Sequence, residues 1–131
     1  MLGYVYRRDA TGEWTQRRLH VPDNVSVSIV TASNTTDKFF LSVTGFTTPT
    51  TLLLGDTRTA SLRTVKTSPS QFNATDLVVE QMETSSTDGT KIPYFTVHRK
   101  DIRYDGSNPT LLYAYGGFQT QPLLPTDALH G

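Results

Sequence analysis

The fold prediction for this chain starts from one stretch of its sequence, Leu111-Leu112-Tyr113-Ala114-Tyr115-Gly116-Gly117-Phe118. A run of apolar and aromatic residues that ends in two glycines predicts a buried strand leading into a tight turn. Glycine permits positive φ and lets another group approach the backbone, and N–H groups after a strand end often stabilise an oxyanion. Taken alone, the octapeptide has a simpler interpretation, in which Gly116-Gly117 only turns the chain and Tyr115 packs in the core.

Two more strands are predicted just upstream of this stretch. Leu77–Glu83 and Lys91–His98 are expected to pair, because the Asp88-Gly89 dipeptide between them is the favoured type of hairpin turn. Arg99–Asn108 is then a charged loop. Pro109–Tyr115 is the third strand, and it begins at a proline whose missing N–H is tolerated at that position. No helix is predicted in the chain.

Four short strands are predicted between Val25 and Lys66, separated by turn signals. Two of them place alternate apolar residues on one face, namely Val25, Val27 and Ile29, then Phe39, Leu41 and Val43. Thr51–Leu54 and Ala60–Lys66 are the other two. Four strands in roughly 40–45 residues is the size of one β-propeller blade, and a single four-stranded sheet also fits a sandwich or a small barrel.

The N-terminal region is predicted to be a hairpin. Gly3–Arg7 and Glu13–Leu19 are its strands, Asp9–Gly12 is its turn, and Trp14 is expected to pack on the inner face. Farther along, Thr67–Gln71 is a polar, proline-containing linker and the strongest signal for a domain boundary.

Composition excludes several classes of function. The chain has 131 residues, with Lys+Arg 12 and Asp+Glu 12, so its formal net charge is zero. We therefore expect no nucleic-acid or membrane partner, because either needs a basic face or a long apolar run. There is no cysteine, and no cluster of His, Asp and Glu indicates a metal, so no cofactor is expected. The N-terminus lacks a signal-peptide core, which favours a cytoplasmic location.

Read as one block, residues 88–118 (DGTKIPYFTVHRKDIRYDGSNPTLLYAYGGF) closely resemble the start of the hydrolase domain of prolyl oligopeptidases. These are serine peptidases that cut short peptides after proline. The resemblance is dense from Leu77 to Phe118 and looser from Val25 to Lys66. It fades after Phe118.

The resemblance implies a mainly β chain, a partial β-propeller followed by the first strands of an α/β-hydrolase domain. Residues 1–67 would be the C-terminal part of the propeller, with one full blade at 25–67. Residues 68–76 would be a linker, 77–118 the N-terminal strands of the peptidase domain, and 119–131 an irregular tail. The implied partners are short proline-containing peptides and the remainder of the peptidase chain, which is needed to complete the fold.

The resemblance also assigns residues to a site. Tyr115 matches the oxyanion tyrosine of the family, and a phenol stays protonated at neutral pH, so it can donate a hydrogen bond to the oxyanion. Gly116 and Gly117 leave room for the substrate carbonyl. Phe118 matches the aromatic residue that lines the proline pocket, and its alternative role is ordinary packing after a turn.

No nucleophile, acid or base is identified in the chain. It contains no G-x-S-x-G motif, and in the resembled family the Ser, Asp and His all follow the oxyanion strand. The triad is therefore expected beyond Gly131, and the isolated chain is expected to be inactive. Tyr113 is expected to be buried packing, His98 a surface histidine, and His20 and His130 are assigned no role. The sequence leaves one alternative open, a non-catalytic all-β binding or interaction module.

Overall fold

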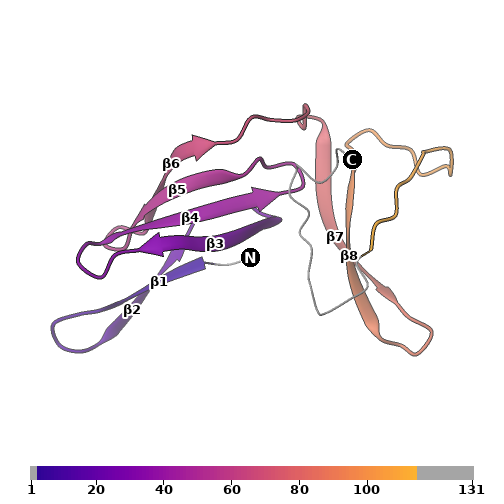
Figure 1. The fold of residues 1–131 in the computed structure, drawn as a ribbon. Helices are drawn as coiled ribbons and strands as arrows, with labels where there is room; N and C mark the ends of the chain where they lie inside the picture. The colour runs from indigo at the N-terminus through magenta and orange to yellow at the C-terminus, as the bar shows by residue number, and fades with distance from the viewer. Residues whose placement is uncertain (1–2, 115–131) are drawn as a thin grey trace.

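The computed structural model describes residues 3–114, which form β-strands and contain no helix (Figure 1). In chain order the strands are β1 (Gly3–Arg8), β2 (Trp14–Leu19), β3 (Val25–Ala32), β4 (Lys38–Gly45), β5 (Thr51–Asp56), β6 (Ser61–Thr67), β7 (Leu77–Ser85) and β8 (Lys91–Arg99). They form three antiparallel sheets, a β1–β2 hairpin, a four-stranded sheet in the order β3-β4-β5-β6, and a β7–β8 hairpin. The predicted mainly β character is confirmed for the described residues.

The four-stranded sheet provides most of the hydrophobic core. Directly opposite residues of paired strands share a face, and Leu41 on β4 lies opposite Leu53 on β5. The alternation predicted for this region is confirmed, since the buried cluster includes Val25, Phe39, Leu41, Val43 and Leu53. Ile29 is an exception and is exposed, because it lies on the edge strand β3, where the register shifts between Ile29 and Thr31.

A glycine makes room for the aromatic ring in this core. Gly55 on β5 pairs directly with Phe39 on β4, and a Cβ atom at position 55 would overlap the Phe39 ring. Glycine in a strand interior usually weakens the strand. Here it allows the Phe39 ring to lie against the backbone of the neighbouring strand and remain buried.

The β1–β2 hairpin packs on the sheet through one of its two faces. Val5 and Leu19 belong to the same buried cluster as the core of the sheet. Trp14 was predicted on this inner face, and that prediction is wrong, because the residue is 66% exposed. Trp14 pairs with Arg8, and strand alternation places both on the face opposite to Val5.

The β7–β8 hairpin is a long ribbon that lies across the end of the four-stranded sheet (Figure 1). Its strands pair in unbroken register from Leu77–Arg99 to Ser85–Lys91. The turn lies where it was predicted but is longer than a two-residue turn. The Ser86 N–H donates to the Thr90 carbonyl at 2.8 Å, so the loop between these two residues has three residues, 87–89. Gly89, the last of them, has a φ of 85°. A three-residue loop ending in a left-handed glycine is the next most common hairpin connection.

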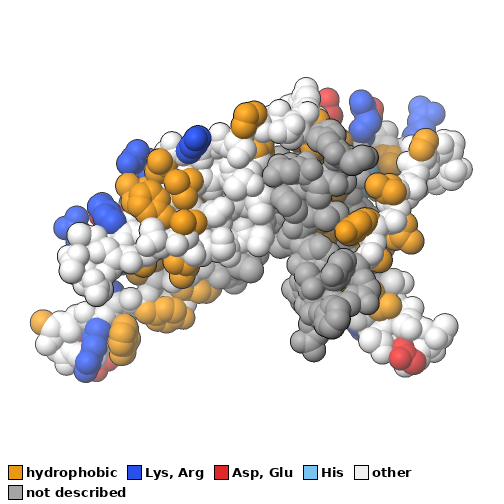
Figure 2. Space-filling model, in the orientation of Figure 1, with side chains coloured by type: hydrophobic (Ala, Val, Ile, Leu, Met, Phe, Trp, Pro, Cys, Tyr) orange, Lys and Arg blue, Asp and Glu red, His pale blue; other side chains and the backbone are white. Residues whose placement is uncertain are grey.

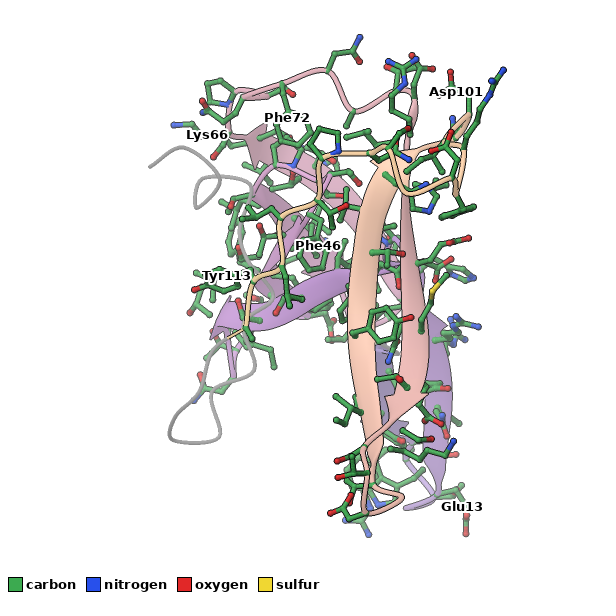
Figure 3. The ribbon with its side chains drawn as sticks, turned by 90° about the vertical axis from the view of Figure 1, so that its right-hand side faces the viewer. Glu13, Phe46, Lys66, Phe72, Asp101 and Tyr113 are labelled. Atoms are coloured by element: carbon green, nitrogen blue, oxygen red, sulfur yellow. The ribbon has the colours of Figure 1, made fainter. Side chains whose placement is uncertain are left out.

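The strand predicted at Pro109–Tyr115 is wrong over its described part, residues 109–114. The chain there is irregular, and Leu112 is 91% exposed. Tyr113, predicted to be buried, is 56% exposed, and Figure 3 shows it away from the two strands of the β7–β8 hairpin. The reason is that a strand needs a neighbour to satisfy its backbone groups. Among residues 3–114, this segment pairs with no strand.

Candidate functional site

The predicted site residues Tyr115, Gly116, Gly117 and Phe118 lie outside the described residues, 3–114. What the structure describes is the scaffold that leads to them, namely the β7–β8 hairpin, the loop 100–108 and the segment 109–114. Side-chain and backbone contacts position this scaffold against the four-stranded sheet and fix the start of the loop.

An aromatic contact and a hydrogen bond join the β7–β8 hairpin to the four-stranded sheet. The ring centroids of Phe46, which follows β4, and Phe95 on β8 are 5.4 Å apart, with the planes tilted by 45°. Figure 3 shows Phe46 at the end of the sheet that is next to the hairpin. This separation and tilt lie within the range that aromatic pairs prefer.

The hydrogen bond comes from Asn24, just before β3. Its side-chain Nδ2 donates to the carbonyl oxygen of Val79 on β7 at 2.9 Å. Asn24 has a φ of 54°, and asparagine is one of the few non-glycine residues that adopt this left-handed conformation readily. The backbone conformation at Asn24 thus directs its side chain from one sheet to the other.

The loop that follows β8 begins with polar contacts on both sides of the hairpin end. Arg99 Nε donates to Asp101 Oδ1 at 2.9 Å, and the pKa of Asp101 is lowered by that hydrogen bond. Lys100 Nζ donates to the Thr75 carbonyl at 2.8 Å, and the Lys100 N–H donates to the Asp76 carbonyl at the same distance. These bonds fix the chain where it leaves the hairpin.

His98, expected to be a surface histidine, is instead held in a side-chain cluster. Only 13% of its side chain is exposed. Nδ1 lies 2.8 Å from the Arg99 carbonyl, and Nε2 lies 3.2 Å from Glu80 Oε2 and 3.3 Å from the Tyr104 hydroxyl. The hydrogen bond to the Arg99 carbonyl and then the Glu80 carboxylate raise the pKa of His98.

The His98 cluster was missed by sequence reasoning, although one signal pointed to it. Glu80 lies opposite Thr96, two residues before His98, so the register of the hairpin places Glu80 and His98 on the same face as diagonal neighbours. That register depends on the length of the turn, and a two-residue turn would have shifted the pairing.

A second charged cluster lies on the four-stranded sheet. Lys38 on β4 is directly opposite Asp56 on β5, and Lys38 Nζ is 2.8 Å from Asp56 Oδ2. The Arg58 backbone N–H donates to Asp56 Oδ1 at 2.8 Å. The hydrogen bond from Lys38, followed by that from Arg58, lowers the pKa of Asp56 far below its ordinary value.

The described residues contain no candidate metal site, and two small cavities among them lie away from the predicted site residues. Residues 3–114 contain no group of three or more His, Asp and Glu side chains that could hold a metal ion. No helix among them is long and apolar enough to cross a membrane. Two small cavities, of about 200 Å³ and about 270 Å³, are lined by residues before position 65 and include none of the predicted site residues.

Comparison with known proteins finds similarity to segments of peptidases. No protein-family model matches it. An uncharacterized peptidase of Sinorhizobium fredii, y4nA, is 41% identical over 115 residues, which are 88% of this chain and 16% of that protein. A prolyl endopeptidase of Elizabethkingia meningoseptica is 33% identical over 102 residues, which are 78% of this chain and 14% of that protein.

Similarity in structure agrees with similarity in sequence. A chain from a structural analysis of two prolyl endopeptidases superposes with a TM-score of 0.72 and 32% identity, over 88% of this chain and 17% of its own length. The described all-β part matches the β-propeller region of prolyl oligopeptidases. The chain thus spans between 14% and 17% of the length of these similar proteins.

Proposed function

We propose that this chain, which is homologous to one segment of the prolyl oligopeptidase family, is the part of a serine peptidase that runs from the end of its propeller into its peptidase domain. The observation that carries the proposal is the extent of the similarity. It continues over 88% of the chain in sequence and in structure, and so extends across both the four-stranded sheet and the β7–β8 hairpin.

In this proposal Tyr115 donates a hydrogen bond to the oxyanion of the tetrahedral intermediate. The phenol keeps its proton at neutral pH and has no need to transfer it. A donor aimed at the developing charge contributes about 10²–10³ in rate. Phe118 supplies an apolar wall for the proline ring of the substrate, and Gly116 and Gly117 leave space for the substrate carbonyl.

The Ser, Asp and His of the triad are proposed to come from the remainder of the peptidase polypeptide. Several features of the described residues support the need for further protein. The β7–β8 hairpin carries apolar side chains on both of its faces, including Tyr94 and Ile92 on one and Phe95 and Val97 on the other. A two-stranded ribbon cannot bury both faces by itself, so covering elements are required.

The proposal is tested in a chimera with a known relative. Residues 1–118 replace the aligned segment of the Elizabethkingia meningoseptica prolyl endopeptidase, and Tyr115→Phe is made in that chimera. With a fluorogenic peptide that is cleaved after proline, we expect kcat to fall about 10²–10³-fold while KM changes little, because the bond forms only in the transition state.

Tyr113→Phe in the same chimera is the matched control, because it removes a phenolic hydroxyl two residues away. We expect it to leave kcat close to that of the parent chimera. Equal losses in both variants would indicate a general effect on folding. A folded chimera that cleaves no proline-containing peptide would contradict the proposed function.

A further inference from the structure

At the end of the β7–β8 hairpin, the His98 ring contacts three hydrogen-bonding groups, and two of them can only accept a hydrogen bond. The His98 ring contacts the Arg99 carbonyl through Nδ1, and Glu80 and Tyr104 through Nε2. A carbonyl oxygen and a carboxylate can only accept hydrogen bonds. The two obligate acceptors lie at different nitrogens of the same ring.

A neutral imidazole cannot satisfy both acceptors. It carries one N–H, and the 2.8 Å contact with the Arg99 carbonyl assigns that proton to Nδ1. The lone pair of Nε2 would then face the Glu80 carboxylate at 3.2 Å, which is repulsive. The imidazolium has a donor on each nitrogen and satisfies the Arg99 carbonyl and Glu80 together.

Tyr104 connects this ring to the loop that follows β8. Its ring meets the His98 ring edge to face, with centroids 5.9 Å apart, and its hydroxyl is 3.3 Å from Nε2. Tyr104 is 79% exposed even with this contact, so its contact with the hairpin is limited to the His98 ring and its edge. The hydroxyl can accept from the imidazolium while Glu80 shares the same proton.

The charged groups around His98 favour its protonated form. Glu80 comes from β7 and lies on the same face of the hairpin as His98. The neighbouring Arg99 side chain projects to the opposite face and is paired with Asp101 at 2.9 Å, which offsets its charge. Lys100 is directed to the Thr75 carbonyl. Among the described residues, Glu80 is the charged side chain that contacts the ring directly, at 3.2 Å from Nε2.

We propose that Glu80, His98 and Tyr104 form a proton-dependent clasp, closed when His98 is an imidazolium, that joins the open end of the β7–β8 hairpin to the loop 100–108. Loss of the proton breaks the hydrogen bond from Nε2 to Glu80 and turns the Nε2 lone pair toward the carboxylate. The Tyr104 hydroxyl can then only donate to Nε2, while the repulsion between the Nε2 lone pair and the Glu80 carboxylate weakens the attachment of the ring to β7 and, with it, that of the loop. The clasp needs no substrate, so it can be tested apart from the peptidase proposal.

The direction of the pH effect follows from the raised pKa of His98, which the Arg99 carbonyl and Glu80 shift above its ordinary value of 6.5. The folded protein holds the proton more tightly than the unfolded chain does. The stabilisation is therefore complete below about pH 6.5 and is lost as the pH rises through the raised pKa.

The test uses hydrogen–deuterium exchange of the whole 131-residue chain, read by mass spectrometry at low concentration. Exchange at the imidazole C2 position reports the titration of His98, and we expect His98 to titrate at a higher pH in the folded chain than in the chain unfolded in urea. After correction for intrinsic exchange rates, amides of residues 99–104 should be about 3- to 10-fold better protected at about pH 5.5 than at about pH 8.5, the range that one net hydrogen bond provides.

Three variants distinguish the clasp from general stability. Glu80→Gln should lower the titration midpoint of His98 toward the value that it has in the unfolded chain. Tyr104→Phe should leave the midpoint raised but remove the pH dependence of protection in the loop. His20→Gln is the matched control and should change neither. The clasp is refuted if His98 titrates no higher in the folded chain than in the unfolded chain, if loop protection is the same at both pH values, or if the hairpin shows no protection at either.

Discussion

At the scale of single residues, two charged clusters stabilise this chain in opposite pH ranges. His98 contributes when it is protonated, whereas Asp56 contributes when it is ionised. Asp56 is almost buried, accepts hydrogen bonds from Lys38 and Arg58, and lies directly opposite Lys38 in the sheet. Each cluster is a local arrangement across two paired strands, so each reports whether its own hairpin is formed.

Asp56→Asn is predicted to destabilise the four-stranded sheet at neutral pH and to have less effect in acid. The folded-state pKa of Asp56 lies below its ordinary value of 3.8, so its contribution is complete above that pH and is lost as the pH falls through the lower value. Unfolding in urea, measured at several pH values, should show the two stabilities converging as the pH falls below about 4.

Asp23→Asn is the matched control for this measurement. Asp23 is exposed and has no ion pair among the residues that the structure describes. Its replacement should change stability little at any pH. A stability difference for Asp56→Asn that stays constant from neutral pH into acid would contradict the assigned role.

At the scale of elements, the main question is how the β7–β8 hairpin is held against the four-stranded sheet. The hairpin shares no ladder with the sheet, so side chains must join them. The Phe46–Phe95 contact and the bond from Asn24 to the Val79 carbonyl do this at neighbouring points. Both start from residues at the ends of β3 and β4, where the sheet meets the hairpin.

A double-mutant cycle with Phe46→Ala and Phe95→Ala is predicted to show a coupling energy of about 0.5–1.5 kcal/mol, the usual range for an aromatic pair. The free energy of unfolding in denaturant is the quantity to measure. Phe46→Ala combined with Tyr94→Ala is the control, because Tyr94 lies on the other face of the hairpin. Coupling as large in the control pair would show that the effect is not specific to the contact.

At the scale of the whole molecule, the described chain leaves much apolar surface uncovered. Figure 2 shows hydrophobic side chains exposed over the β1–β2 hairpin and over the β7–β8 hairpin. The exposed large residues include Tyr6, Trp14, Ile29, Val30, Ile92 and Val97. The outer strands of each sheet also present unpaired backbone groups, which are templates for association with other chains.

The 131-residue chain expressed by itself is therefore predicted to bind a hydrophobic dye and to self-associate as its concentration rises. Sedimentation velocity over a concentration series would measure the association. In the chimera with the prolyl endopeptidase, the same surfaces are expected to be covered, and dye binding should fall. A monodisperse monomer with a single sharp thermal transition would contradict this prediction and would favour a self-contained module.

Local patterns in the sequence were enough to predict most of the fold. Period-2 alternation placed the strands of the four-stranded sheet and of both hairpins to within a few residues, and Asp-Gly and Asp9–Gly12 located two of the turns. These features depend on near neighbours in the chain, through strand alternation and the backbone freedom of glycine. The resemblance to prolyl oligopeptidases likewise came from a contiguous stretch and agrees with the relatives found.

Only the tertiary structure decided the features that depend on which elements meet. It placed Trp14 on the outer face of its hairpin and enclosed His98 between Glu80 and Tyr104. Within residues 3–114, it also left the segment 109–114 without a strand partner. Alternation predicts which residues share a face of a strand, but it does not show which of the two faces packs against other elements. Burial, pKa shifts and strand pairing are set by atoms distant in the sequence, so they become known only when the sheets are assembled.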